Sequence, residues 1–161
     1  PLPTKSGKLE IHCQTLADII RDFGYITLPP IAQYHPPLEG YEDTFEDFEA
    51  RAKGEYPLQL VTIHYGRRSH SVFDNIQQLR AVFPQEFMMN PLDAAARGIE
   101  HGDTVLVRSR HGKVLRPAFL TERMTPGVVY LGEGAWVEMD EEKGIDLAGA
   151  TNTLSGSNPT G

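Results

Sequence analysis

Short apolar runs alternate with turn sequences over most of the chain from Tyr56 onward. Such runs, rich in β-branched residues or alternating with polar ones, predict short strands. Turn signals such as Gly102-Asp103 and Pro126-Gly127 separate them. Many short strands with only small helices favour a closed β-barrel over a sheet covered by helices. The strands are predicted at 58–63, 86–89, 104–107, 114–120 and 128–131.

Two short helices are predicted between these strands. One begins near Asp74, because Asp74 and Gln77 have the spacing of a capping box and apolar residues follow at helical intervals. The other begins at Asn90, with asparagine as the cap and Pro91 at the first helical position. Gly98 is predicted to end this second helix.

The first 52 residues have a different pattern. A short alternating strand is predicted at 6–13 and a short helix at 15–23, with Thr15 as its cap. Two proline pairs follow between residues 29 and 37, and such a segment runs extended and must lie on something else to bury its apolar side chains. We therefore predict an extended N-terminal arm or connector, residues 1–52, followed by a β-barrel domain, residues 53–161.

Composition places the chain among ordinary soluble proteins, with 40% hydrophobic and 23% charged residues. No apolar run approaches the length of about 20 residues that a membrane span needs, and no signal-peptide pattern is present. A formal net charge of −7 argues against a nucleic-acid partner. The sequence begins without methionine and stops in a turn-like stretch, so we expect it to be a piece of a larger protein.

A group of donors lies between the first predicted strand and the first predicted helix. Arg67 and Arg68 stand among two histidines and two serines, just before the expected start of a helix. Guanidinium groups and the free N–H groups of a helix N-terminus both favour an anion, so this stretch predicts a phosphate or pyrophosphate site. A solvated turn whose arginines pair with the acidic residues of the chain is the alternative.

The sequence lacks the common motifs of metal sites and catalytic sites. None of the six histidines has the paired spacing of a zinc site, so we predict no metal site. We also predict no catalytic residue, because no nucleophile elbow, Walker loop or dinucleotide-binding glycine loop is present.

The small residues of Gly132–Trp136 would let the backbone approach a flat ligand. Trp136 either stacks on a ring or lies in the core. Asn152 and Thr153 add amide and hydroxyl donors near the end of the sequence.

The order and spacing of these stretches resemble the C-terminal domain of molybdopterin-dependent oxidoreductases of the dimethyl sulfoxide reductase family, and among them the catalytic subunit of the anaerobic enzymes. The arm resembles the connector into that domain. The resemblance covers nearly all of the chain, and the stretches that carry it are 6–10, 60–62, 64–71, 90–99, 102–105, 126–129, 132–136 and 152–154.

The resemblance implies a six-stranded double-psi β-barrel that closes over one end of bis(molybdopterin guanine dinucleotide) with its molybdenum. It implies that the molybdenum ligand and any iron–sulfur cysteines lie in domains absent from this chain. Arg67 is the contact least clearly implied, because its side chain could face solvent. The residues expected to contact the cofactor are Thr62, His64, Arg67, Arg68, His70, Ser71, Asn75, Gly134, Trp136, Asn152 and Thr153.

The function implied is a cofactor-binding domain that clamps a pterin or phosphate part of the cofactor in an anaerobic S-oxide reductase. The full-length protein would be an enzyme and the isolated fragment soluble but inactive. The remaining domains of the polypeptide, an iron–sulfur electron-transfer subunit and a membrane anchor subunit are the partners implied. Export to the periplasm or the outer face of the cytoplasmic membrane is implied as well. The alternative is a non-enzymatic barrel module that binds a protein or phosphate partner.

Overall fold

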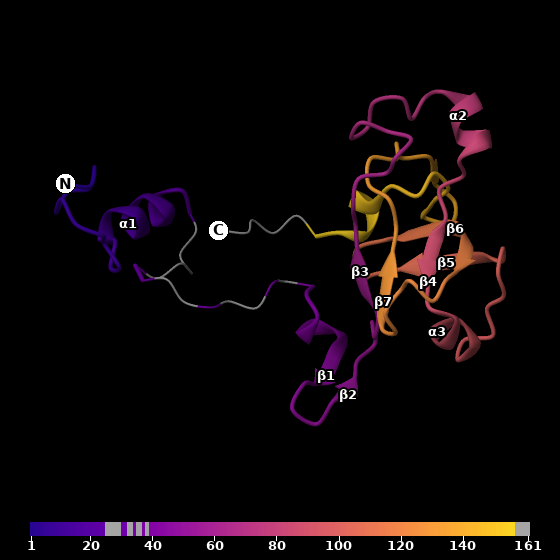
Figure 1. Cartoon of the computed structure of the whole chain (residues 1–161), viewed down its shortest axis with the longest axis horizontal. Coiled ribbons are helices and arrows are strands. Elements are labelled where there is room, and N and C mark those ends of the chain that lie inside the picture. Colours follow the sequence, from indigo (N-terminus) through magenta and orange to yellow (C-terminus); the bar gives the residue numbers. More distant parts are fainter. Residues whose placement is uncertain (25–29, 32–33, 35–36, 38, 157–161) are drawn as a thin grey trace. The chain divides into compact units, whose positions relative to one another are not determined.

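The computed structural model describes residues 1–24, 30–31, 34, 37 and 39–156 (Figure 1). The chain divides into two compact units, the first containing Pro1–Pro37 and the second Leu38–Asn158. The boundary predicted at residue 52 therefore falls inside the second unit. Much of the proline-rich segment that was predicted to run extended lies outside the described residues.

The first unit contains one helix, α1 (Gln14–Asp22). The helix begins one residue before Thr15, so the predicted capping role of Thr15 is wrong, and no side chain caps its N-terminus. The strand predicted at 6–13 is also wrong, because the described part of this segment forms only a single bridge, between His12 and Ile31.

The second unit is mainly β with short helices, as predicted. A two-stranded ribbon precedes a seven-stranded mixed sheet that contains all five strands expected from the sequence. The strands are β1 (Phe45–Asp47), β2 (Ala52–Lys53), β3 (Gln59–Val61), β4 (Phe87–Met89), β5 (Thr104–Arg108), β6 (Lys113–Leu120), β7 (Val128–Tyr130), β8 (Met139–Asp140) and β9 (Ile145–Asp146). The helices are η1 (Glu42–Thr44), α2 (Gln77–Val82), α3 (Pro91–Ala95) and η2 (Thr151–Leu154). Within the described residues, no helix is long and apolar enough to cross a membrane.

The strands of the larger sheet pair in the order β3-β7-β4-β6-β9-β8, with β5 joined to β6 as an antiparallel hairpin. β3 runs parallel to β7, and β4 runs parallel to β6. In the part of the chain that the structure describes, this path is open, since no pairing joins β3 to β8. The mixed sheet is thus established, whereas the closed double-psi barrel stays a prediction.

Apolar side chains from β4, β6 and β7 fill the core of this unit. Met89, Val114 and Leu131 are among its most deeply buried members, and Leu154 of η2 packs with them. The start of α3 is as predicted: the Asn90 Oδ1 accepts a hydrogen bond of 2.8 Å from the backbone N–H of Leu92, with Pro91 in the first turn.

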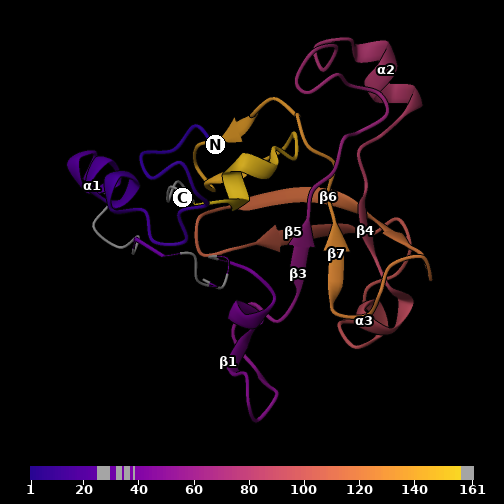
Figure 2. The same ribbon diagram turned by 60° about the vertical axis from the view of Figure 1, so that its left-hand side comes forward.

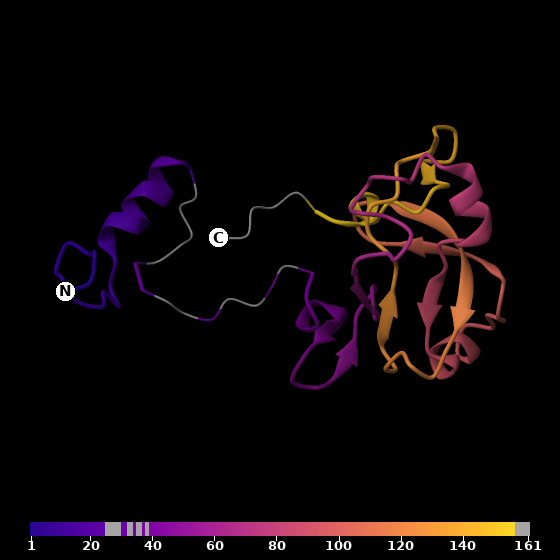
Figure 3. The same ribbon diagram turned by 45° about the horizontal axis from the view of Figure 1, so that its top comes forward.

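The parallel pairing of β3 and β7 determines where the loops lie. Parallel neighbours end at the same edge of a sheet, so the β3 loop (residues 62–76) and the β7 loop (residues 131–138) leave from one edge. Figure 2 shows β3 and β7 side by side with both arrows pointing the same way. In Figure 1, Figure 2 and Figure 3, α2 and η2 lie at this end of the unit and α3 at the opposite end.

Candidate functional site

A buried carboxylate, Asp74, holds the β3 loop together. Its Oδ1 accepts hydrogen bonds of 2.8 Å from Arg67 Nη2 and 2.7 Å from Arg68 Nη1. Its Oδ2 accepts 2.8 Å bonds from Arg80 Nη2 and from the backbone N–H of Trp136. The side chains of Asp74 and Arg68 are each 1% exposed and that of Arg67 is 3% exposed. The network therefore joins the β3 loop, α2 and the β7 loop in a water-poor interior.

This geometry overturns the cap predicted at Asp74 and decides two points that the sequence left open. Asp74 is not a helix cap, because α2 begins at Gln77 without a side-chain cap and the Asp74 carboxylate faces arginines. Arg67 does not face solvent. The arginines also pair with an acid of their own chain, which was the alternative to an anion seat, although the pairing is buried and not solvated. A direct contact of Arg67 or Arg68 with the cofactor stays a prediction.

Arg68 and Gln85 tie the surrounding loops to one another. Arg68 donates through Nε and Nη2 to the backbone carbonyl of Glu133, at 3.1 and 2.8 Å, and through Nη2 to Gln85 Oε1 at 2.7 Å. The Gln85 Nε2 donates to the carbonyls of Gly132 and Gly149, at 2.8 and 2.9 Å. Gly149 lies just before η2. One buried amide thus fixes the β7 loop and the approach to η2, and the sequence carried no signal for it.

The hydrogen bonds of Asp74 outweigh the effect of its burial. Burial alone raises the pKa of this carboxyl group, but the Trp136 amide and the guanidinium groups of Arg68 and Arg80 stabilise the charged form. The pKa of Asp74 is therefore lowered from 3.8 to about 2. A depressed carboxyl pKa adds stability above the unfolded value that disappears as the pH falls through the folded value.

Asp74 is therefore expected to make the second unit acid-sensitive between about pH 4 and about pH 2. The contribution of Asp74 to the free energy of unfolding should fall by about 2 kcal/mol as the pH drops through that interval, since one pKa unit corresponds to about 1.4 kcal/mol. A ¹³C NMR titration of the carboxyl group should show a midpoint near pH 2, with the denaturant midpoint falling over the same range. A titration midpoint near pH 4 would contradict the charged network.

The predicted contact residues outside this network lie mostly on the surface. Exposed side chains offer imidazole, hydroxyl and amide groups, whereas Gly134 and Thr153 are half-buried. Asn152 and Thr153 belong to η2. Thr62 lines a separate cavity of about 400 Å³ whose wall includes apolar residues of β3 and β5. The exposed members are Thr62, His64, His70, Ser71, Asn75, Trp136 and Asn152.

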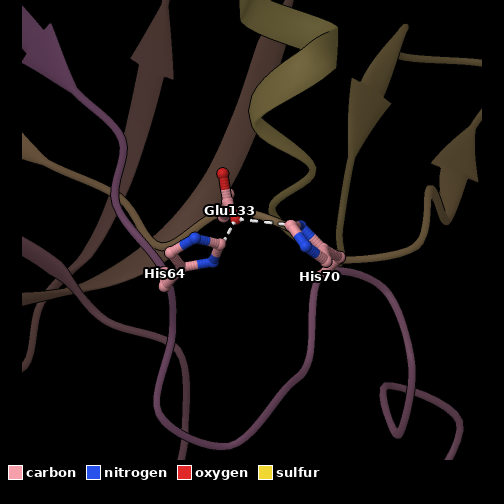
Figure 4. A group of neighbouring side chains, drawn as sticks. All are labelled: His64, His70 and Glu133. Atoms are coloured by element: carbon pink, nitrogen blue, oxygen red, sulfur yellow. Dashed lines mark ion pairs between the residues drawn. The ribbon is translucent and has the colours of Figure 1, made fainter.

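His64 and His70 come together around a residue to which the sequence assigned no role, Glu133 (Figure 4). The Nδ1 atoms of His64 and His70 lie 2.7 and 3.5 Å from the Glu133 Oε1. The two imidazole centroids are 5.0 Å apart. The available signal was a lone acid between two glycines, but the partners are more than 60 residues away along the chain.

Trp136 and Gly134 hold the β7 loop against the β3 loop. The Trp136 Nε1 donates a 2.9 Å hydrogen bond to the carbonyl of Ser71, and the residue is 50% exposed, so Trp136 does not lie in the core. Gly134 has φ +84°, and a Cβ there would lie 1.9 Å from the carbonyl oxygen of His70. The space in front of Gly134 is therefore filled by the backbone of the neighbouring loop, and the approach of residues 132–136 to a flat ligand stays a prediction.

The chain is similar to long reductases over nearly its whole length. It is 42% identical over 160 residues to dimethyl sulfoxide reductase DmsA of Escherichia coli (strain K12), a match that covers 99% of this chain and 19% of that protein. It is 36% identical over 162 residues to a trimethylamine-N-oxide reductase of Haemophilus influenzae, covering 96% of this chain and 18% of that protein. The chain thus spans about a fifth of the length of these relatives.

A solved structure shares the fold. Acetylene hydratase from Pelobacter acetylenicus aligns with a TM-score of 0.61 and 24% identity, over 92% of this chain and 19% of that one. Residues 58–160 match the family described as the molydopterin dinucleotide binding domain, which is most of the second unit. The chain therefore belongs to the molydopterin dinucleotide binding domain family.

Proposed function

We propose that the exposed edge formed by the β3 loop, the β7 loop and η2 binds the pterin part of a molybdopterin dinucleotide cofactor. The observation that carries the proposal is the pair of exposed imidazoles, His64 and His70, presented by loops that a buried network holds rigidly. Membership of the family supports a dinucleotide cofactor as the ligand.

The donor set fits a pterin. A pterin edge carries several ring nitrogens and oxygens, and exposed imidazole, hydroxyl and amide groups can donate to it and accept from it. Arg67 and Arg68, which would suit a phosphate, both donate to Asp74, and the two Arg67 nitrogens without a partner in the described part of the chain, Nε and Nη1, are buried and not open to a ligand. We therefore assign His64, His70 and Ser71 to direct contact, and Arg67 and Arg68 to positioning of the loop that carries them.

Three further residues complete the proposed binding edge. The Trp136 ring is oriented by its bond to Ser71 and leaves half of the residue open for stacking on the ligand. Asn152 and Thr153 of η2 add amide and hydroxyl groups, with Thr62 and Asn75 at the margin. When bound, the cofactor supplies the redox chemistry of molybdenum. The side chains of this chain bind and orient the pterin.

The wider role is part of the same proposal. In the full-length protein the sheet would close as a double-psi barrel over bis(molybdopterin guanine dinucleotide), in an enzyme that reduces an S-oxide. An iron–sulfur subunit, a membrane anchor subunit and the remaining domains would be its partners, and the protein would be exported. Similarity to dimethyl sulfoxide reductases supports this role. The 161-residue chain alone is expected to have no reductase activity.

Changing both histidines tests the proposal in the full-length protein. The double variant His64→Ala/His70→Asn should contain at least about tenfold less molybdenum per protein, since the hydrogen bonds of both imidazoles, at about 1 kcal/mol each, are lost. Alanine has no polar side-chain group, and the shorter asparagine has no atom at the position of the imidazole Nε2. Asparagine is chosen at His70 because φ there is +53°, a conformation that asparagine tolerates. Elemental analysis of the purified protein measures the effect.

The matched control is His12→Ala, an exposed histidine of the first unit that should leave the molybdenum content unchanged. Thermal unfolding of the double variant should match the wild type, because both replaced side chains are exposed. A molybdenum content equal to the wild type in the double variant would remove the proposed binding edge.

A further inference from the structure

The cluster of His64, His70 and Glu133 has the composition of a metal site. Each residue offers one ligand atom, and these atoms lie within 4.8 Å of one another. The Glu133 Oε1 is buried and accepts no hydrogen bond among the described residues, although the Nδ1 atoms of both histidines lie close to it. A buried carboxylate oxygen without a donor is costly unless a cation or a proton satisfies it.

The backbone holds the three positions in place without any ligand. The backbone N–H of Glu133 donates a 3.1 Å bond to the carbonyl of Ile63, next to His64, and the Glu133 carbonyl accepts from Arg68. His70 lies in a turn closed by reciprocal backbone bonds between Ser69 and Val72. The ligand-bearing backbone is thus preorganised, which lowers the entropy cost of binding an ion.

The side chains need only small adjustments to reach a metal. Tetrahedral zinc with bonds of about 2.1 Å separates its ligand atoms by roughly 3.4 Å. The side chains of His64 and His70 are 74% and 79% exposed, so both rings can rotate to such separations without disturbing the core. Their exposure also leaves room for water in the remaining coordination positions.

The ligand chemistry selects the class of metal. Two neutral imidazole nitrogens and one carboxylate oxygen form the donor set of open zinc sites. Imidazole ligands suit zinc, copper and nickel, whereas magnesium and calcium prefer oxygen. The Glu133 carboxylate gives the site one negative charge, and the chain carries a net charge of −7. We propose that His64, His70 and Glu133 bind a divalent metal ion that prefers imidazole ligands, such as Zn²⁺, in the cofactor-free chain.

This inference is independent of the proposed cofactor role. Metal binding is measured on the chain without cofactor, whereas the cofactor role is measured as the molybdenum content of the full-length protein. One consequence rests on the proposed function: since the same imidazoles would contact the pterin, a bound metal and a bound pterin would exclude each other at this edge.

Titration of the untagged 161-residue chain with Co²⁺ tests the site, followed by Zn²⁺ competition. Visible d–d absorption should saturate at one equivalent and disappear when Zn²⁺ is added. Glu133→Gln and His64→Ala should each weaken binding at least about tenfold, since changes around metal ligands cost 10–100-fold in affinity. Isothermal titration calorimetry gives the affinities.

The controls are His12→Ala and Glu141→Gln, an exposed histidine and an exposed acid outside the cluster, which should bind Co²⁺ as the wild type does. Circular dichroism checks that each variant is folded, and His64→Ala decides the result if Glu133→Gln is not. No saturable binding at one equivalent would overturn the proposal, and so would wild-type affinity in a folded cluster variant.

Discussion

Replacement of Asp74 with alanine is expected to lower the free energy of unfolding of the second unit by about 3–5 kcal/mol. The change removes one carboxylate from the buried guanidinium groups of Arg67 and Arg68, which are 3% and 1% exposed. A buried charge that loses its counter-charge is left desolvated and unpaired, and this loss is among the largest that a single substitution causes. Urea unfolding followed by circular dichroism measures it.

The matched control is Asp43→Ala, which also removes an acid paired with an arginine. Asp43 and Arg110 form an exposed pair, with side chains 41% and 49% exposed, and such pairs contribute about 0–1 kcal/mol. The difference between the two variants therefore measures what burial and the additional hydrogen bonds of Asp74 contribute beyond one exposed pair. Equal and small losses for both would show that the interior network does not stabilise the loops.

Gly134→Ala is expected to separate the β7 loop from the β3 loop. A Cβ at this position would lie 1.9 Å from the carbonyl oxygen and 2.5 Å from the carbonyl carbon of His70, which are backbone atoms that cannot rotate away. The left-handed backbone, with φ +84°, adds strain of about 1 kcal/mol, and the overlap adds about 2 kcal/mol more. The expected total loss of unfolding free energy is about 3 kcal/mol.

Gly144→Ala is the control for Gly134→Ala. Gly144 also has a positive φ, +63°, but a Cβ added there would meet no atom within 4 Å. It should cost about 1 kcal/mol, the strain of the backbone alone. In the full-length protein, Gly134→Ala should also lower the molybdenum content, since the binding edge needs both loops. Equal losses of stability in the two variants would refute the close approach at His70.

The buried network also decides which variants can report on binding. The Arg68 side chain makes four hydrogen bonds to three different residues, so Arg68→Ala would take one donor from Asp74, one from Gln85 and both side-chain donors from the Glu133 carbonyl. An altered cofactor content in that variant would follow from a damaged loop as readily as from a lost contact. Variants of the exposed histidines separate the two effects, because the histidine side chains contribute little to the stability of the fold.

Local patterns were sufficient for most of the secondary structure. Each strand predicted after residue 56 is present within a few residues of its expected ends. The Asn90 cap was predictable because it depends on residues within one turn of each other. The order of the strands was not, because β3 pairs with β7, about 70 residues later, and no local pattern encodes such a pairing.

The structure places the arginines of the predicted site in a buried network, and it overturns the local role predicted for Asp74. Asp74 had the local spacing of a helix cap, yet three guanidinium groups and the Trp136 amide compete for its carboxylate. Charged donors in a water-poor interior bind a carboxylate more strongly than the backbone N–H groups of a six-residue helix would. Trp136 likewise remains at the surface because its Nε1 has a partner there, the carbonyl of Ser71.

By itself, the sequence determined a mainly β domain, the strands β3 to β7 with the turns between them, and the loop in which the donors gather, because these depend on residues near one another in the chain. Only the tertiary structure decided which charges are paired, which imidazoles are exposed, and that Glu133 lies between His64 and His70. Parallel pairing of β3 and β7 brings two distant loops to one edge, where Arg67 and Arg68 are buried against Asp74 and the two histidines are exposed.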